Sequence, residues 1–261
     1  GLLGAKTGYI GKVKNDQLGR IFAHDIHACH VEYAGPIAAS DHPGETGRCL
    51  VMVTPDGERS MSTALGVSVS LNSDDIDPGE AARARWLYLE GYLFDSDAAK
   101  AAYAKAIAAT KGAGGLVSFT VSDPFCVERH RSDMQRLIRE DVDLLFANKA
   151  EIMALYETNS LEIALEAVSR QVACAAVTLS EEGALVVRGD HRVKVPPPAV
   201  DVMDTTGAGD LFAAGFLAGQ IRGHADEASA HMGCIAACEA ISHLGARPQA
   251  DLAEMMAAQG F

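Results

Sequence analysis

The chain has 261 residues, enough for one large α/β domain with a sizeable hydrophobic core. Its 22 Lys and Arg residues against 35 Asp and Glu residues give a net charge of −13, the wrong sign for general binding to nucleic acid or anionic lipid. Apolar residues make up 48% of the chain, but no uninterrupted apolar stretch approaches the length of a membrane span, so we predict neither a nucleic-acid nor a membrane partner.

The six cysteines show no Cys-x-x-Cys pair and no zinc-like spacing. Cys234 and Cys238 lie four residues apart in an alanine-rich helical stretch, which is typical of small buried thiols. This usage predicts a reduced, cytoplasmic protein. The first residues, 1–5, have no basic region and no signal-peptide pattern, so we expect no targeting segment there; they are typical of a helix end entering a strand, and we expect further sequence upstream.

The first predicted helix lies between Gln17 and Cys29, where apolar residues recur at helical spacing. This spacing places His24 and His27 on the opposite face. Together with His30 they would offer nitrogen ligands to a metal, but a solvated helix face is the simpler interpretation, and we predict no metal there.

Three short strands are predicted next, at residues 31–36, 46–53 and 59–64. The segment Thr54-Pro55-Asp56-Gly57 joins the second strand to the third and has the residues of a tight turn. Consecutive short strands with tight turns indicate a small antiparallel sheet rather than a βαβ unit. A plain edge hairpin is the alternative.

After Asp77-Pro78 the pattern changes to an alternation of strands and helices. Strands are expected at 86–90, 116–121, 142–147 and 174–179, helices at 95–110, 133–140, 149–156 and 161–171, a hairpin at 184–196, and further helices from 210, 226 and 230 onward. Buried apolar strands separated by helices predict an α/β fold with a doubly wound, mainly parallel sheet.

Ligands of such sheets bind beyond the carboxyl ends of the strands. We therefore expect the polar segments that follow the strands to lie at one rim of the sheet. These are residues 90–92, Asp123, Asn148, residues 180–183 and residues 204–210.

The last of these segments, Asp204-Thr205-Thr206-Gly207-Ala208-Gly209-Asp210, opens an apolar helix. The first N–H groups of a helix lack intrahelical partners, and the helix dipole favours negative charge there. Glycines allow the backbone to approach a ligand closely. A carboxylate beside a bound phosphate is suited to act as a general base on an attacking hydroxyl. The alternative is that Asp210 only caps the helix.

Residues 204–217 closely resemble the C-terminal signature of the ribokinase-like (PfkB) family of carbohydrate and nucleoside kinases. The resemblance implies that Asp210 is the catalytic base and that the amides of Gly207, Ala208 and Gly209 form an anion hole. It also implies one ribokinase-like domain over residues 1–261, with residues 31–64 as a β lid over the sugar. The family's first strand, with its sugar-binding aspartate, and its Gly-Gly-Asn segment have no counterpart, so we expect this domain to be N-terminally incomplete.

The segment Asn148-Lys149-Ala150-Glu151 matches the family's Asn-x-x-Glu motif, which influences binding of Mg²⁺ and phosphate. An amide oxygen and a carboxylate suit Mg²⁺, which prefers oxygen ligands and keeps several waters. We expect Glu151 to face solvent at the rim. A helix capping box is the alternative for this pair.

The resemblance also implies contacts to the nucleotide and to a monovalent cation. Residues 178–183 resemble the family's segment along ATP, although Ser180 stands where many members have glycine. A simple polar turn is the alternative for this segment. The implied ATP contacts are Asn148, Glu151, Thr178, Ser180, Gly183, Thr205 and Gly233, the last beside the adenine. The candidates for a K⁺ site are Asp204, Thr206 and Gly245.

The sequence therefore predicts an ATP-dependent kinase that phosphorylates a primary hydroxyl of a nucleoside or sugar. Residues 58–63 and 88–93 are similar to the branch that contains bacterial adenosine kinases, so adenosine is the first candidate. A ribose, fructose or other carbohydrate kinase is one alternative, and a non-catalytic ligand-binding relative is another. A dinucleotide-dependent dehydrogenase is excluded because no Gly-x-Gly-x-x-Gly follows an early strand. We expect a monomer or a homodimer.

Overall fold

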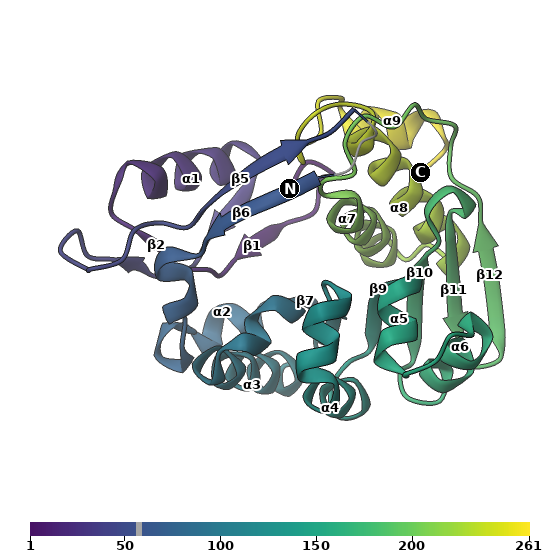
Figure 1. Ribbon diagram of the computed structural model, residues 1–261, viewed down its shortest axis with the longest axis horizontal. Helices are drawn as coiled ribbons and strands as arrows, with labels where there is room; N and C mark the ends of the chain where they lie inside the picture. The colour runs from purple at the N-terminus through teal and green to yellow at the C-terminus, as the bar shows by residue number, and fades with distance from the viewer. Residues whose placement is uncertain (56–58) are drawn as a thin grey trace.

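The computed structural model describes residues 1–55 and 59–261. Its largest part is a six-stranded mixed sheet with the strand order β12-β11-β10-β9-β8-β7 (Figure 1). The four parallel strands are β7 (Trp86–Glu90), β8 (Leu116–Thr120), β9 (Leu144–Asn148) and β10 (Cys174–Thr178). The hairpin of β11 (Ala184–Arg188) and β12 (His191–Val195) extends the sheet in antiparallel fashion. The predicted doubly wound, mainly parallel α/β fold is confirmed.

Helices cover both faces of this sheet because successive strand residues point to opposite sides. In β9, Leu145 packs with the helices on one face, whereas Leu144 and Phe146 pack with those on the other. The first face carries α3 (Asp97–Gly112), α4 (Pro124–Glu140), α5 (Lys149–Leu155) and α6 (Leu161–Ser169), and the second carries α7 (Ala208–Arg222) and α8 (Asp226–Ile241). Both strand faces are thus buried, as a parallel sheet requires.

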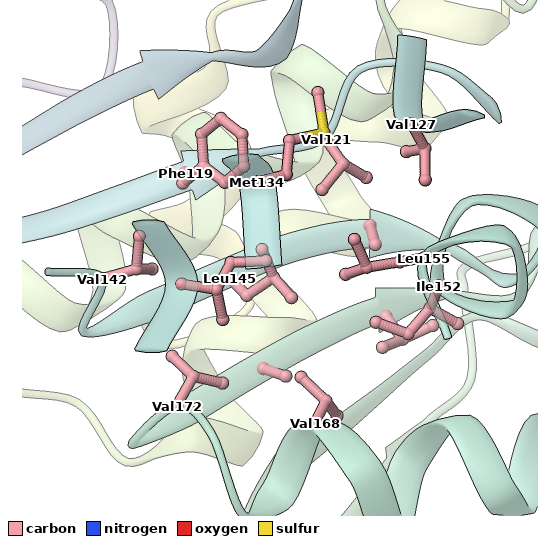
Figure 2. Packing of buried hydrophobic residues seen from close by; sticks show 14 of the residues in the cluster. Phe119, Val121, Val127, Met134, Val142, Leu145, Ile152, Leu155, Val168 and Val172 are labelled. Atoms are coloured by element: carbon pink, nitrogen blue, oxygen red, sulfur yellow. The ribbon is translucent and has the colours of Figure 1, made fainter. Parts of the chain in front are cut away.

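The largest cluster of buried apolar side chains lies between the sheet and the first group of helices (Figure 2). Phe119 and Leu145 from the strands meet Met134 of α4 and Ile152 and Leu155 of α5, and all five are fully buried. Burying such side chains stabilises the fold by roughly 1.5 to 3 kcal/mol each. This core fixes the positions of the strand ends at the rim.

On the second face, α7 and α8 lie in direct backbone contact. A Cβ on Gly215 would lie 2.5 Å from the carbonyl oxygen of Met232, and one on Gly233 would lie 2.8 Å from the ring of Phe212. Only glycine permits this approach. The two helices therefore form one rigid pair that carries the start of α7.

The N-terminal third differs from the prediction. β3 (Val31–Tyr33) pairs in parallel with β1 (Thr7–Tyr9), and β4 (Ile37–Ala38) pairs in parallel with β2 (Val13–Lys14). The predicted helix, α1 (Gln17–Ala28), lies in the chain between β2 and β3 and makes the crossover that parallel pairing needs. The expectation that residues 31–36 join an antiparallel sheet is therefore wrong.

The small antiparallel sheet that was expected is present as two strands, β5 (Arg48–Val53) and β6 (Arg59–Ala64). All six residues of β6 are exposed. The hairpin extends toward the loops before α7 (Figure 1). Of the predicted turn, Asp56 and Gly57 lie outside the described residues, and the lid role of residues 31–64 stays a prediction.

Among the remaining helices, α4 is longer than predicted and the others are short. α4 begins at Pro124, well before the predicted start at 133, because Asp123 caps it by accepting a hydrogen bond from the Cys126 N–H. The helix is kinked at His130, which interrupts the apolar spacing. Short helices complete the chain: α2 (Pro78–Ala82), α9 (Leu252–Ala258), and the 3₁₀ turns η1 (Gly66–Ser70), η2 (Ser73–Asp75), η3 (Gly91–Asp95) and η4 (Ser180–Glu182).

Candidate active site

Four carboxylates from four different segments meet at the carboxyl ends of the parallel strands. Burial, and after it the negative charge of Asp210 at the start of α7, raises the pKa of Glu90 at the end of β7. Burial raises the pKa of Glu151, in the first turn of α5, and the charge of Asp123, which follows β8, adds to this rise. Charges influence one another over several ångströms, and the strands β7, β8 and β9 that carry or precede three of these groups are neighbours in the sheet. The structure thus brings together the rim residues that the sequence placed there.

The start of α7 is shaped to receive an anion. Its N-cap is Gly207, in the left-handed conformation with φ +82°, and among the described residues no side chain caps the helix. A Cβ on Gly207 would lie 2.9 Å from the Cβ of Ala246, whereas one on Gly209 would meet nothing within 4 Å. Gly209 therefore borders open space. The Ala208 N–H donates a hydrogen bond to the Thr205 carbonyl oxygen at 3.3 Å, whereas the amides of Gly209 and Asp210 have no acceptor among the described residues and are available to a ligand.

The Asp210 carboxylate lies in this first turn and accepts no hydrogen bond from any residue in the described part of the chain. It reaches solvent, but the protein around it desolvates the group enough to raise its pKa, an effect that the positive charge of Arg59 opposes. Because Gly207 is the N-cap, Asp210 is not a capping residue. A carboxylate with unused acceptor positions and a raised pKa is suited to take a proton.

Asp204 has a different task. It is 2% exposed, and its Oδ1 accepts hydrogen bonds from the Thr206 N–H at 2.9 Å and the Thr206 hydroxyl at 2.5 Å. Its Oδ2 accepts from the Gly245 N–H at 2.9 Å. The Thr206 hydroxyl, followed by the Gly245 amide, lowers the pKa of Asp204. Asp204 therefore ties the loop before α7 to the loop after α8.

The three candidates for a monovalent cation site, Asp204, Thr206 and Gly245, thus lie together. Both carboxylate oxygens of Asp204 already accept hydrogen bonds from the other two residues. The donor set is one of oxygens, as K⁺ requires, but it is occupied by internal hydrogen bonds. The cation role of these residues stays a prediction.

Asn148 and Glu151 form a closed capping box at the start of α5. The Asn148 Oδ1 accepts from the Glu151 N–H at 2.8 Å, and the two Glu151 oxygens accept from the Asn148 backbone and side-chain amides at 2.8 and 2.7 Å. Glu151 is only 7% exposed, so the expectation that it faces solvent is wrong. Burial raises its pKa to about 6, the Asn148 backbone N–H opposes this, and Asp123 adds to it.

This geometry bears on how Mg²⁺ would bind. The oxygens of Asn148 and Glu151 are of the hard type that Mg²⁺ prefers. They are already engaged with each other, so the pair fits a metal held through its bound waters better than one held by direct ligation. The box is also a structural feature in its own right, as the alternative interpretation of the sequence anticipated.

The turn after β10 contains the segment expected along the nucleotide. Thr178 lies opposite Asn148 in the paired strands β10 and β9. Ser180 adopts a left-handed conformation with φ +54°, and Gly183 has φ +85°, where a Cβ would lie 2.0 Å from the Val195 carbonyl oxygen. Glycine is favoured at both positions, so Ser180 stands in a backbone conformation suited to the glycine of other family members.

Gly233 is buried in α8 against Phe212 of α7. Its observed contribution is the close packing of the two helices. Its contact with adenine stays a prediction.

Two residues that the sequence did not assign to the site are part of it. Arg59 of β6 donates a hydrogen bond from Nη1 to the Thr205 Oγ1 at 2.7 Å, and its charge lowers the pKa values of Asp204 and Asp210. Glu90 was placed at the rim without a role; its pKa is raised to about 7, first by burial and then by Asp210. An arginine in an exposed strand gives no sequence signal for a contact 146 residues away.

Comparison with known proteins agrees with this geometry. Residues 1–252 match the family described as "pfkB family carbohydrate kinase". The chain belongs to the PfkB family of carbohydrate kinases. PfkB kinases are phosphotransferases that act on hydroxyl groups of sugars or nucleosides, and the predicted enzyme class is confirmed.

Three similar proteins illustrate the range within the PfkB family. The crystal structure of adenosine kinase from Sinorhizobium meliloti has a TM-score of 0.96 and 45% identity, over 100% of this chain and 79% of that one. An uncharacterized sugar kinase from Archaeoglobus fulgidus is 31% identical over 94% of this chain and 95% of its own length. A putative ribokinase II from E. coli, in complex with ATP and Mg²⁺, shares the fold with a TM-score of 0.88 and 20% identity, over 99% of this chain and 85% of that one.

In the described part of this PfkB kinase, no helix combines the length and the apolar character needed to cross a membrane.

Proposed function

We propose that this kinase transfers the γ-phosphoryl group of ATP to a primary hydroxyl of a nucleoside, with adenosine as the first candidate. The observation that carries the proposal is the Asp210 carboxylate, which has no hydrogen-bond donor among the described residues and lies in the uncapped first turn of α7. The 45% identity to an adenosine kinase supports the choice of acceptor. We expect a cytoplasmic enzyme that is a monomer or a homodimer.

In the proposed reaction, Asp210 takes the proton of the acceptor hydroxyl as its oxygen attacks the γ-phosphorus, and the bond from phosphorus to the β-phosphate oxygen breaks to release ADP. The raised pKa of Asp210 makes it a better proton acceptor than an ordinary aspartate. The amides of Gly207, Ala208, Gly209 and Asp210 stabilise the negative charge on the transferred group.

The nucleotide is held, in this proposal, by the turn after β10 and the loop before α7. Thr178, Ser180, Gly183, Thr205 and Gly233 are its candidate contacts. Asn148 and Glu151 hold Mg²⁺ through water, and a bound Mg²⁺ would neutralise phosphate charge. K⁺ at Asp204, Thr206 and Gly245 would stiffen the loop before α7, which Asp204 already organises.

On the acceptor side, Glu90 and Arg59 flank the base. Glu90 lies half-buried at the end of β7 and interacts electrostatically with Asp210, and we assign it to accept a hydrogen bond from an acceptor hydroxyl. Arg59, in the exposed hairpin of β5 and β6, donates a hydrogen bond to Thr205 in the loop before α7. This contact supports a lid role for the hairpin, since it links the hairpin to the loop that leads into Asp210.

The proposal is tested by measuring ADP formation with a panel of nucleosides and sugars at fixed ATP and Mg²⁺. We expect adenosine to give the highest kcat/KM. Higher values with ribose, fructose or another sugar would identify the enzyme as a sugar kinase, an alternative favoured by the relative from Archaeoglobus fulgidus. ATP binding without turnover of any acceptor would identify a non-catalytic ligand-binding relative and contradict the proposal.

A further inference from the structure

Ser122 has an unusual backbone conformation at the rim of the sheet. It follows β8 and has φ +75°, in the left-handed region that non-glycine residues rarely adopt. Backbone strain of this kind persists only where the surrounding structure enforces it, and it is concentrated at functional sites. The strain therefore raises the question of what the Ser122 side chain does.

The Ser122 hydroxyl bridges two groups at the end of β7. Its Oγ accepts a hydrogen bond from the Gly91 N–H at 2.8 Å and donates one to the Glu90 Oε2 at 3.3 Å. The Ser122 carbonyl oxygen also accepts from the Tyr92 hydroxyl at 3.3 Å. Ser122 thus forms hydrogen bonds with three consecutive residues, Glu90, Gly91 and Tyr92, at and after the end of β7.

The close approach of the two connections depends on Gly91. A Cβ at this position would lie 2.6 Å from the Val121 carbonyl oxygen. The Cys126 thiol donates a hydrogen bond to the Gly91 carbonyl oxygen at 3.2 Å, which adds a further link between the segments. The segment after β8 is therefore fastened along the segment after β7, and the left-handed turn at Ser122 lies in the middle of this contact.

We propose that Ser122 is a positioning residue that holds the Glu90 carboxylate in the orientation needed to bind the acceptor hydroxyl beside Asp210. The inference rests on the proposed function, because Glu90 is assigned there to the acceptor. It goes further by giving a task to a strained residue that has no hydrogen bond with Asp210 or with the loop before α7 among the described residues.

The charges around Glu90 explain why such a residue is needed. Burial and the negative charge of Asp210 raise the pKa of Glu90 to about 7, whereas hydrogen bonds from Tyr88 and Ser122 lower it. The titratable groups that face Glu90 from the elements packed around it are Tyr9, Tyr88, Tyr92, Tyr103, Glu151 and Asp210. None of these is a cation, so the hydroxyl donors favour the charged, hydrogen-bond-accepting form of Glu90.

Two substitutions of Ser122 distinguish the effect of its hydroxyl from the effect of its backbone strain. Ser122→Gly removes the hydroxyl and relieves the strain, since glycine adopts positive φ readily. Ser122→Ala removes the hydroxyl and keeps the strain. We expect both variants to raise the pKa of the Glu90 side chain, measured by NMR titration of its carboxyl carbon, and only Ser122→Gly to melt at or above the temperature of the parent protein.

The titration needs no substrate, so it decides the inference even if the proposed function fails. An unchanged Glu90 pKa in Ser122→Gly would show that Ser122 only shapes the turn, and the inference would be wrong. A raised pKa in both variants supports it.

The kinetic arm uses the acceptor found in the activity panel. Loss of the single, long hydrogen bond from Ser122 to the Glu90 carboxylate is expected to raise the acceptor KM by roughly 2- to 10-fold in both Ser122 variants, with the ATP KM unchanged. In a Glu90→Gln background, Ser122→Ala should change the acceptor KM no further, because the two residues act through the same group. Additive effects of the two substitutions would overturn the inference.

Discussion

Two helices begin at the same rim of the sheet, and they begin in opposite ways. α5 starts with the reciprocal capping box of Asn148 and Glu151, in which both carboxylate oxygens are hydrogen-bonded. α7 starts at a left-handed glycine with no side-chain cap, and the Asp210 carboxylate in its first turn has no donor among residues 1–55 and 59–261. A side-chain cap stabilises a helix by about 0.5 to 2 kcal/mol. The start of α7 lacks this stabilisation and keeps its amides available for a ligand.

The open start of α7 is nevertheless held in place by other groups. Asp204 fixes the preceding loop to Gly245, and the glycine contacts between α7 and α8 fix the helix itself. The two helix starts teach that position at the rim does not by itself make a binding site. What distinguishes them is whether the polar groups are satisfied within the chain or left for a partner.

The largest expected effect is on turnover, from Asp210→Asn. The substitution keeps the size of the side chain but removes the proton acceptor, so kcat should fall by about 10² to 10⁴. The melting temperature should stay the same or rise, because an amide replaces a partly desolvated carboxylate. Steady-state kinetics and thermal unfolding check both parts, and a kcat within about threefold of the parent would be too small a loss for a general base.

The corresponding change at the closed helix start, Asn148→Ala, should act mainly on stability. It removes the two hydrogen bonds of the Asn148 side chain and leaves the buried carboxylate of Glu151 with only the backbone N–H of residue 148 as a donor from this position, at a cost of about 1 to 3 kcal/mol in the free energy of unfolding. Denaturant unfolding measures this loss. The Mg²⁺ concentration needed for half-maximal activity should also rise.

A matched control for Asn148→Ala is Ser160→Ala, which removes the cap of α6, where the Ser160 hydroxyl accepts a hydrogen bond from the Ile163 N–H. It should reduce stability and leave the Mg²⁺ requirement unchanged. An equal change in the Mg²⁺ requirement in both variants would assign Asn148 a purely structural task.

Gly209→Ala should separate stability from binding at the open helix start. Alanine in a helix is favoured over glycine by roughly 0.5 to 1 kcal/mol, and the new Cβ meets nothing within 4 Å, so the free energy of unfolding should rise. ATP affinity should fall, since the methyl group extends into the space assigned to phosphate. Calorimetric ATP titration and chemical denaturation test this, and unchanged ATP affinity would place the phosphate elsewhere.

The smallest effect is expected from Arg59→Gln, and it concerns pH. Arg59 lowers the pKa of Asp210, so its loss should raise that pKa further and move the acid limb of the kcat/KM profile to higher pH. Arg48→Gln on the neighbouring strand β5 is the control, because Arg48 forms a salt bridge with Glu45 and not a hydrogen bond to the loop before α7. Identical profiles for the two variants would show that Arg59 does not act on the base.

The sequence predicted those features whose causes are local. Alternating apolar strands and helices, the Asn148 to Glu151 spacing and the glycines around Ala208 each determine structure within a few residues of themselves. The features it missed depend on distant contacts. The parallel pairing of Val31–Tyr33 with β1 requires knowing which strand lies beside it, and the burial of Glu151 requires knowing what packs over α5.

The same limit applies to the candidate site. Asp210 could be assigned to the candidate site because its motif is contiguous, whereas Arg59 reaches that site from a strand whose own residues are all exposed. Ser122 carries no sequence signal, because a serine in a left-handed conformation is visible only in the backbone angles. Glu90 was placed at the rim by the end of its strand, but its coupling to Asp210 depends on the packing of α7 against the sheet.

The most direct test of the account compares the two helix starts in one experiment, by following backbone amide NMR signals while a non-hydrolysable ATP analogue is added without Mg²⁺. We expect the amides of Gly209 and Asp210 to shift strongly, because they bind phosphate, and those of Lys149 and Glu151 to shift little, because the capping box already satisfies that helix start. Saturation of the protein with the analogue while the Gly209 and Asp210 signals stay in place would contradict the assignment of the open start of α7 as the phosphate site.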